Sequence, residues 1–199
     1  MRQRPVLDVS KLPDYGYGPR SPVWWGTVAF CILEGTGFVV AIGGYLYLTF
    51  VNQQWPLSAP PLDLLWSSIV TAVAVVSVWP NWLAKRNGER EDLRRVRRDL
   101  VVMSVTGVVL IVLRVFEIGA LPIRWDQNAY GSMVWMLLGL HTAHIVTDVI
   151  DTIVLTVLMF TRHGHGKRFS DVSDNAFYWN FVVLSWPPIY VLLYWTPRL

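Results

Sequence analysis

The fold is decided by the longest apolar stretch of the chain, residues 130–160, which reads YGSMVWMLLGLHTAHIVTDVIDTIVLTVLMF. This stretch holds no lysine or arginine, and its only acidic side chains are Asp148 and Asp151. A helix that crosses the hydrocarbon core of a bilayer needs about 20 mostly apolar residues, because each residue adds about 1.5 Å. The stretch therefore predicts a membrane-spanning helix that is long enough to tilt or to project from the bilayer.

Four further stretches meet the same requirement. Membrane-spanning strands would alternate apolar and polar residues over about 10 positions, whereas these stretches are continuously apolar and much longer. The sequence thus predicts an all-α integral membrane protein, a five-helix bundle. It divides into a cytoplasmic N-terminal segment, 1–22, and a single membrane domain, 23–199. The helices are expected at residues 23–50, 64–84, 100–121, 130–160 and 177–195.

The composition agrees and excludes several classes of protein. The chain has 199 residues, of which 53% are hydrophobic and 16% charged, and its mean hydropathy is +0.39. Soluble domains carry about 25% charged residues, so a soluble nucleotide-binding enzyme and a disordered chain are both excluded. A single cysteine, Cys31, excludes an intrachain disulfide and a CxxC redox or zinc pair. The net charge is only +3, and we expect no nucleic-acid partner.

The distribution of lysine and arginine predicts the orientation. Fourteen of them lie in the N-terminal segment and in the second and fourth loops, against two in the other loops and the C-terminal tail. Positive residues favour the cytoplasmic side, so the N-terminus is predicted to be cytoplasmic and the C-terminus periplasmic. Tryptophans are expected to form belts at the two boundaries. The cytoplasmic belt would hold Trp24, Trp25, Trp79, Trp82 and Trp179, and the opposite belt Trp55, Trp66, Trp125 and Trp195.

The second loop carries a basic run, KRNGEREDLRRVRRD, at residues 85–99. One interpretation is a contact with anionic lipid, to which each basic residue near the surface contributes about 1 kcal/mol. The other is a topology signal on a solvated extension of a helix. The sequence leaves both open.

Glu34 is the ionisable residue of the first predicted helix. An ionisable side chain at the bilayer centre costs on the order of 2.5–3.5 kcal/mol, so it requires a partner or a function. Glu34 lies between small residues, in CILEGTGF, which let a helix or a lipid approach closely. Two hypotheses remain open: a protonatable or headgroup-binding carboxyl, and a neutral carboxylic acid hydrogen-bonded between helices.

Two further groups of ionisable residues lie inside predicted helices. Arg114 and Glu117 are three residues apart on the third helix, a spacing that predicts a local ion pair. The fourth helix carries one polar stripe at spacings of 3, 4 and 3, which must face other helices or a wet cavity. The stripe consists of His141, His144, Asp148 and Asp151.

The stripe raises the question of a metal or haem. Histidine and carboxylate at helical spacing do bind metals, but such bundles draw ligands from several helices, and here the others offer only Glu34 and Glu117. His141 and His144 are one turn apart on one helix, so they cannot approach one haem iron from opposite faces. A metal at His163 and His165 competes with a flexible polar turn in the loop TRHGHGKRF. We predict neither a metal nor a redox cofactor in this chain.

Three stretches together resemble a known family. The first, WGTVAFCILEGTGF, has an aromatic–glycine pair followed by a glutamate eight residues beyond the glycine, here Gly26 and Glu34. The second, YGSMVWMLLGLHTAHIV, is similar to a YGS segment followed by Gly-x-His-x-x-His. The third is AFYWNFVVLSWPPIYVLLYW. The matching residues of the last two are Tyr130, Gly131, Ser132, Gly139, His141, His144, Tyr178, Trp179, Phe181, Val182 and Trp186.

The family is subunit III of the haem–copper cytochrome oxidases, in its shorter five-helix bacterial form. The chain departs from it in the last helix, where Asn180 and Val183 stand in place of a histidine and an aspartate. Asp148 replaces a glycine expected after the histidine pair, and Asp148 and Asp151 are a conjectural substitute for the missing polar contact. Pro187 and Pro188 are expected to kink the last helix.

The resemblance implies a non-catalytic subunit in a bacterial inner membrane. It implies packing on oxidase subunit I, and a subunit II in the same complex, with haem and copper in those partners. It also implies phospholipid in a cleft near Glu34 and the histidines, and support for sustained proton uptake. Two alternatives remain: an accessory protein of a nitric oxide reductase, and a standalone proton-coupled carrier, for which the sequence shows no inverted repeat.

Overall fold

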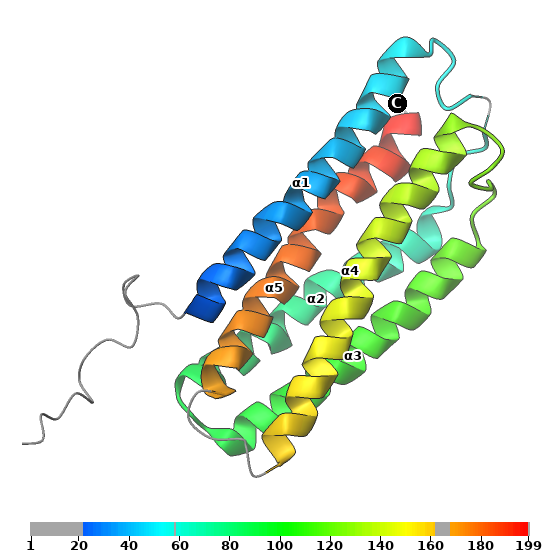
Figure 1. The fold of residues 1–199 in the computed structure, drawn as a ribbon. Helices are drawn as coiled ribbons and strands as arrows, with labels where there is room; N and C mark the ends of the chain where they lie inside the picture. The colour runs from blue at the N-terminus through cyan, green and yellow to red at the C-terminus, as the bar shows by residue number, and fades with distance from the viewer. Residues whose placement is uncertain (1–21, 58, 162–167, 199) are drawn as a thin grey trace, which may run out of the picture.

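The computed structural model describes residues 22–57, 59–161 and 168–198 (Figure 1). Over these residues the chain forms five helices that are long and apolar enough to cross a membrane, which confirms the predicted all-α bundle. The N-terminal segment and the loop with His163 and His165 lie outside the described residues. The helices are α1 (Pro22–Val51), α2 (Leu64–Glu89), α3 (Leu93–Gly119), α4 (Ala129–Phe160) and α5 (Arg168–Tyr190), followed by the π-helical turn η1 (Val191–Trp195) and the 3-10 turn η2 (Thr196–Arg198).

Three helices begin at a polar side chain that caps them. The Asp63 carboxylate accepts from Leu65 N at 3.0 Å, and that of Asp92 from Arg95 N at 3.2 Å. The Asn128 carbonyl accepts from Gly131 N at 2.8 Å at the start of α4. Such caps satisfy backbone N–H groups that have no partner within the helix.

Two helices begin earlier than the hydropathy predicts. Helix α3 begins at Leu93 rather than at 100, because Asp92 caps it and Val96 is fully buried although arginines surround it. Helix α5 begins at Arg168 rather than at 177, and its additional turns bury Phe169 and Val172. The basic run is therefore largely helical: α2 continues to Glu89 and α3 resumes at Leu93.

The two prolines of the last helix do not end it. Helix α5 passes through Pro187 and Pro188 to Tyr190, and the backbone then forms the π-helical turn η1. A proline removes one backbone donor from the helix ladder, and wider π turns are a common local adjustment. The side chain of Arg198 then donates to the backbone carbonyls of Tyr194 and Leu62, which ties the end of the chain to the α1–α2 connection.

The helices alternate in direction, so the bundle has two distinct ends (Figure 1). We call the basic end the one that holds the α2–α3 turn with its arginines, the first turns of α1 and α5, and the last turn of α4. Helix α4 contacts α1, α3 and α5, whereas α1 packs mainly against α4 and α5 and is the least buried of the five. Polar residues of α4 are thus within reach of three other helices.

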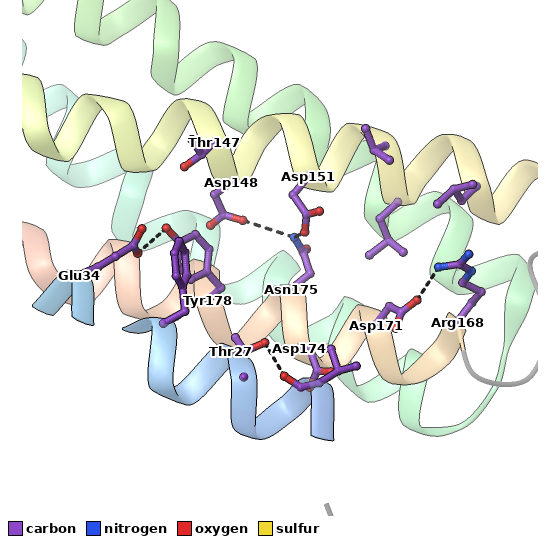
Figure 2. A pocket seen from close by; sticks show the side chains of 16 residues that line it. Thr27, Glu34, Thr147, Asp148, Asp151, Arg168, Asp171, Asp174, Asn175 and Tyr178 are labelled. Carbon is purple, nitrogen blue, oxygen red and sulfur yellow. Dashed lines mark hydrogen bonds and ion pairs between the residues drawn. The ribbon is translucent and has the colours of Figure 1, made fainter. Parts of the chain in front are cut away.

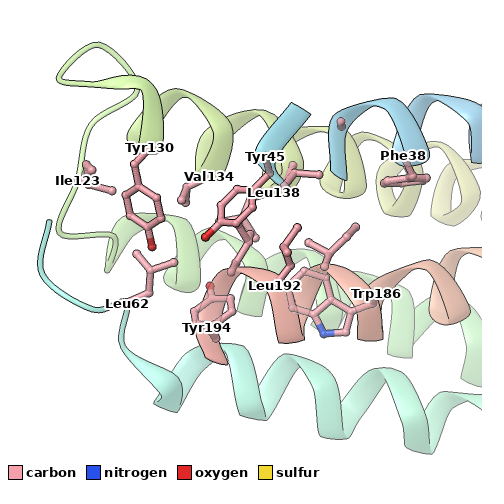
Figure 3. Close-up of a cluster of buried hydrophobic side chains, with 14 residues drawn as sticks. Phe38, Tyr45, Leu62, Ile123, Tyr130, Val134, Leu138, Trp186, Leu192 and Tyr194 are labelled. Carbon is pink, nitrogen blue, oxygen red and sulfur yellow. The ribbon is translucent and has the colours of Figure 1, made fainter. Parts of the chain in front are cut away.

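Aromatic residues fill the core at the end opposite the basic end (Figure 3). Tyr45 and Tyr130 are fully buried, and the Trp55 ring meets both edge-on at centroid distances of 5.2 and 5.4 Å. Tyr130 begins α4, and the next two residues fix the loop before it. Ser132 Oγ donates to Trp125 O at 2.7 Å, and Gly131 lies against the backbone of Arg124.

One tryptophan was wrongly placed in the boundary belts. Trp179 is only 2% exposed, and its Nε1 donates to Ser77 Oγ of α2 at 2.9 Å. The other expected belt residues Trp25, Trp79 and Trp82 are indeed on the outer surface. Trp179 is buried because its face of α5 packs against α2.

Gly131 and Gly139 form a matched pair for testing α4. A Cβ on Gly131 would lie 2.3 Å from the carbonyl oxygen of Arg124, whereas a Cβ on Gly139 meets nothing within 4 Å. We expect Gly131→Ala to lower the free energy of unfolding by about 1–3 kcal/mol, the usual cost of overpacking. Gly139→Ala should leave it unchanged or raise it by up to about 1 kcal/mol, because alanine favours helix. Unfolding in mixed detergents measures both; an equal loss in both variants would contradict this packing.

Candidate functional site

The four residues of the polar stripe on α4 each contact a neighbouring helix. His141 faces α3 and α5, His144 faces α1, and Asp148 and Asp151 face α5. Inside a bilayer such groups must find partners within the protein, because lipid offers none. The stripe is therefore the feature through which α4 holds three other helices.

The ion pair on α3 is part of a wider buried network. Arg114 Nη1 lies 2.6 Å from Glu117 Oε2, and both side chains are almost fully buried. The predicted self-contained pair has further partners: Tyr194 donates to Glu117 Oε1 at 2.5 Å, and the Arg114 guanidinium lies 4.1 Å from the Trp186 ring centroid. This network joins α3 to α5 and η1.

The contacts of His141 fix its protonation. Arg114 Nη2 lies 2.9 Å from Nδ1, and an arginine can only donate, so Nδ1 carries no proton. Nε2 lies 3.1 Å from Val182 O, which can only accept, so Nε2 carries the proton. The ring also stacks on Trp186 at a centroid distance of 4.9 Å. His141 is thus a neutral structural link that has no free nitrogen for a metal or a proton.

His144 forms the contact with Glu34 of α1. Its Nδ1 lies 2.6 Å from Leu140 O and therefore donates to it, while Nε2 lies 3.4 Å from Glu34 Oε1. Tyr178 of α5 donates to the other carboxyl oxygen of Glu34 at 2.7 Å. His144, Glu34 and Tyr178 therefore join α1, α4 and α5 at this point.

Asp148 and Asp151 are joined through an amide that the sequence did not single out. Asn175 Nδ2 lies 3.3 Å from Asp148 Oδ1, 3.2 Å from Asp151 Oδ2 and 3.1 Å from Thr152 Oγ1. Asp148 is fully buried, whereas Asp151 is exposed on the surface of the bundle. Asn175 is thus the α5 partner of the two aspartates. Asn180, at the position of the family histidine, instead accepts from Asn81 of α2 at 3.0 Å.

A cavity of about 690 Å³ lies between α1, α4 and α5, toward the basic end of the bundle. Figure 2 shows Glu34, Tyr178, Asp148, Asp151 and Asn175 gathered on its walls. Its other polar lining residues include Thr27, Thr147, Arg168, Asp171 and Asp174, and its apolar ones include Val23, Phe30, Val154, Leu155 and Leu158. A cavity of this size with mixed polar and apolar walls suits an amphiphile.

The geometry bears on a metal or haem centre. Among the described residues, no three His, Cys, Asp or Glu side chains are grouped closely enough to hold a metal ion. Both nitrogens of His141 are already engaged, and so is Nδ1 of His144. The described residues thus show no such group of three at the polar stripe, and the absence of a cofactor from this chain stays a prediction.

The remaining motif residues have structural positions. Gly26 lines the cavity, and a Cβ there would meet nothing within 4 Å. Trp186 donates to Thr71 Oγ1 of α2 at 2.7 Å while its ring supports Arg114 and His141. Phe181 packs on the cluster that contains Phe38, and Val182 supplies the carbonyl that orients His141.

Comparison with known families matches residues 49–197 to cytochrome c oxidase subunit III. The chain belongs to the cytochrome c oxidase subunit III family. The match begins at the end of α1, so Gly26 and Glu34 lie outside it, whereas the motifs of α4 and α5 lie within it. The polar stripe and its α3 and α5 partners are thus features of the matched region.

Relatives named cytochrome c oxidase subunit 3 span bacteria and animals. The protein of Thermostichus vulcanus is 23% identical over 172 residues, 85% of each chain. That of Drosophila melanogaster is 22% identical over 86% of this chain and 68% of the relative. The chain spans about half of the rabbit protein, Oryctolagus cuniculus, at 25% identity over 154 residues. These relatives support an oxidase subunit III role within a cytochrome c oxidase complex.

Apart from Tyr178, which is a motif residue, the sequence did not single out the α5 side of the cavity. Arg168, Asp171, Asn175 and Tyr178 recur at helical spacing and line it together, but the prediction began the last helix after most of them. The signal was available in the spacing of 3, 4 and 3, which is the same as in the stripe on α4.

Arg114 and Arg124 provide a matched pair for the buried network. We expect Arg114→Met to lower the free energy of unfolding by about 3–5 kcal/mol, because it leaves Glu117 as a buried charge without its cation. Arg124→Met removes an exposed pair with Asp126 and should cost under about 1 kcal/mol. Unfolding in mixed detergents compares them, and equal losses would show that the Arg114 network does not hold the bundle together.

Proposed function

We propose that this chain is the cofactor-free subunit III of a terminal haem–copper cytochrome c oxidase in a bacterial inner membrane. In this role it packs on the catalytic subunit I, with a subunit II in the same complex, and holds phospholipid in the cavity between α1, α4 and α5. It also sustains proton uptake by the complex. Haem and copper belong to the partner subunits, and the N-terminus lies in the cytoplasm.

The observation that carries the lipid-holding role is the cavity itself. It is walled by apolar side chains of α1 and α4, among them Phe30, Val154 and Leu158, which suit acyl chains. Glu34 lies in its wall and is held in place by Tyr178 and His144. A bound lipid there would fill a gap that the weakly packed α1 leaves open and would fasten this helix to α4 and α5.

The role in proton uptake rests on the same residues. The cavity lies toward the basic end, which the distribution of lysine and arginine predicts to be cytoplasmic. Its carboxylates can take up and release protons at that surface, and Glu34, with His144 beside it, lies at its inner end. His141 takes no part, because both of its nitrogens are engaged.

Substitution of Glu34 in the intact oxidase tests this function. We expect Glu34→Ala to lower the phospholipid retained per complex and to shorten the period of sustained turnover, because Tyr178 and His144 lose their partner on α1. The haem absorption spectra should not change. Glu34→Gln keeps a hydrogen-bond acceptor and should retain lipid, but it should still lose activity early if the acid is needed for proton uptake.

Asp126→Asn is the matched control, because it neutralises a carboxylate on an exposed loop at the opposite end of the bundle. It should behave like the unmodified complex in lipid content and in turnover. A haem spectrum altered by Glu34→Ala would contradict the cofactor-free role. Unchanged lipid retention and turnover would contradict the function assigned to the cavity.

A further inference from the structure

The cavity between α1, α4 and α5 is strongly acidic. Its described lining residues include one basic side chain, Arg168, whose Nη1 is already 3.0 Å from Asp171 Oδ2. Glu34, Asp148 and Asp151 also line it, and no lysine or arginine among the described lining residues faces them. A ligand that enters this cavity therefore meets an excess of carboxylates.

Asp148 has a buried acceptor that nothing in the described structure satisfies. The side chain is 0% exposed, and its Oδ2 has no hydrogen-bond partner among the described residues. Asn175 Nδ2 contacts Asp148 only through Oδ1, so this amide leaves Oδ2 without a donor. A buried carboxylate oxygen without a donor is costly, and this one lines the cavity (Figure 2).

The walls and the acidic lining together define the class of ligand. The apolar residues of α1 and α4 accept acyl chains, so the ligand is an amphiphile. The unsatisfied oxygen of Asp148 takes a hydrogen-bond donor, and the exposed Asp151 beside it favours a cationic one; a protonated primary amine offers three N–H groups. An anionic head group would bring a further negative charge against carboxylates in a medium of low dielectric constant.

We propose that this cavity selects phospholipids with a protonated amine in the head group over phospholipids with an anionic head group. The selectivity rests on the proposed lipid-holding function and specifies its ligand. The amine lies against Asp148 and Asp151. Arg168 lies in the first turn of α5, at the basic end, and its guanidinium, which has five N–H donors and contacts Asp171 through Nη1, is the cationic group offered to the lipid phosphate.

The test exchanges the intact oxidase complex into an equimolar mixture of phosphatidylethanolamine and phosphatidylglycerol. Lipids retained after dilution are identified by mass spectrometry. Gly26→Phe identifies the lipid of the cavity, because a side chain at this open position on its wall would fill the space. Lipids retained by the unmodified complex and absent from Gly26→Phe are those of the cavity.

We expect the cavity lipid of the unmodified complex to be phosphatidylethanolamine by about tenfold, the ratio that 1.4 kcal/mol produces. Asp148→Asn should bring the ratio close to one, since the amide removes a charge and keeps the shape. Asp151→Asn tests the same charge at an exposed position if the buried substitution prevents folding. Asp126→Asn should keep the tenfold preference, because that carboxylate is paired with Arg124 on a loop outside the cavity.

The possible results distinguish a failure of the head-group selectivity from a failure of the lipid-holding function. Cavity lipid with a ratio of one, or rich in phosphatidylglycerol, would overturn the selectivity and leave the lipid-holding function standing. A tenfold preference that survives both Asp148→Asn and Asp151→Asn would also overturn it, because the aspartates would not be its source. If no lipid distinguishes the unmodified complex from Gly26→Phe, the lipid-holding function itself fails.

Discussion

An ionisable side chain inside a bilayer needs a partner within the protein, and this requirement organises the bundle. Helix α4 carries four such side chains on one face, and each of them contacts a residue of another helix. His141 meets Arg114 of α3, His144 meets Glu34 of α1, and Asp148 and Asp151 share Asn175 of α5. The polar stripe therefore joins α4 to α1, α3 and α5, and the apolar clusters pack beside it.

The same contacts fit the proposed supporting role. Both nitrogens of His141 and Nδ1 of His144 are engaged in hydrogen bonds, and the carboxylates of the stripe contact α5 through Asn175. Where these contacts leave space, between α1, α4 and α5, they leave a cavity with apolar walls and acidic side chains. The residues that join the helices of the bundle thus also line the proposed ligand site.

Hydropathy and spacing predicted much of this arrangement. The lengths of the five apolar stretches gave the helices, because the thickness of a bilayer sets that length. The spacing of His141, His144, Asp148 and Asp151 predicted that they share one face of a helix. The spacing of Arg114 and Glu117 predicted their ion pair. The sequence could not show which helix each residue would meet, since partners such as Arg114 with His141 depend on packing between distant segments. The start of α5 was missed because its first turns are polar. Asn175 lies in these turns and was missed for the same reason.

In the proposed function, this chain is a companion subunit without a redox centre in a cytochrome c oxidase. The most direct measurement is a mass-spectrometric inventory of the assembly that the full chain forms when it is purified in mild detergent. We expect a 22.8 kDa polypeptide without covalent or retained haem, together with a haem- and copper-bearing catalytic subunit and phospholipid. A haem-free homo-oligomer alone, a nitric oxide reductase as the partner, or haem bound to this chain would contradict it.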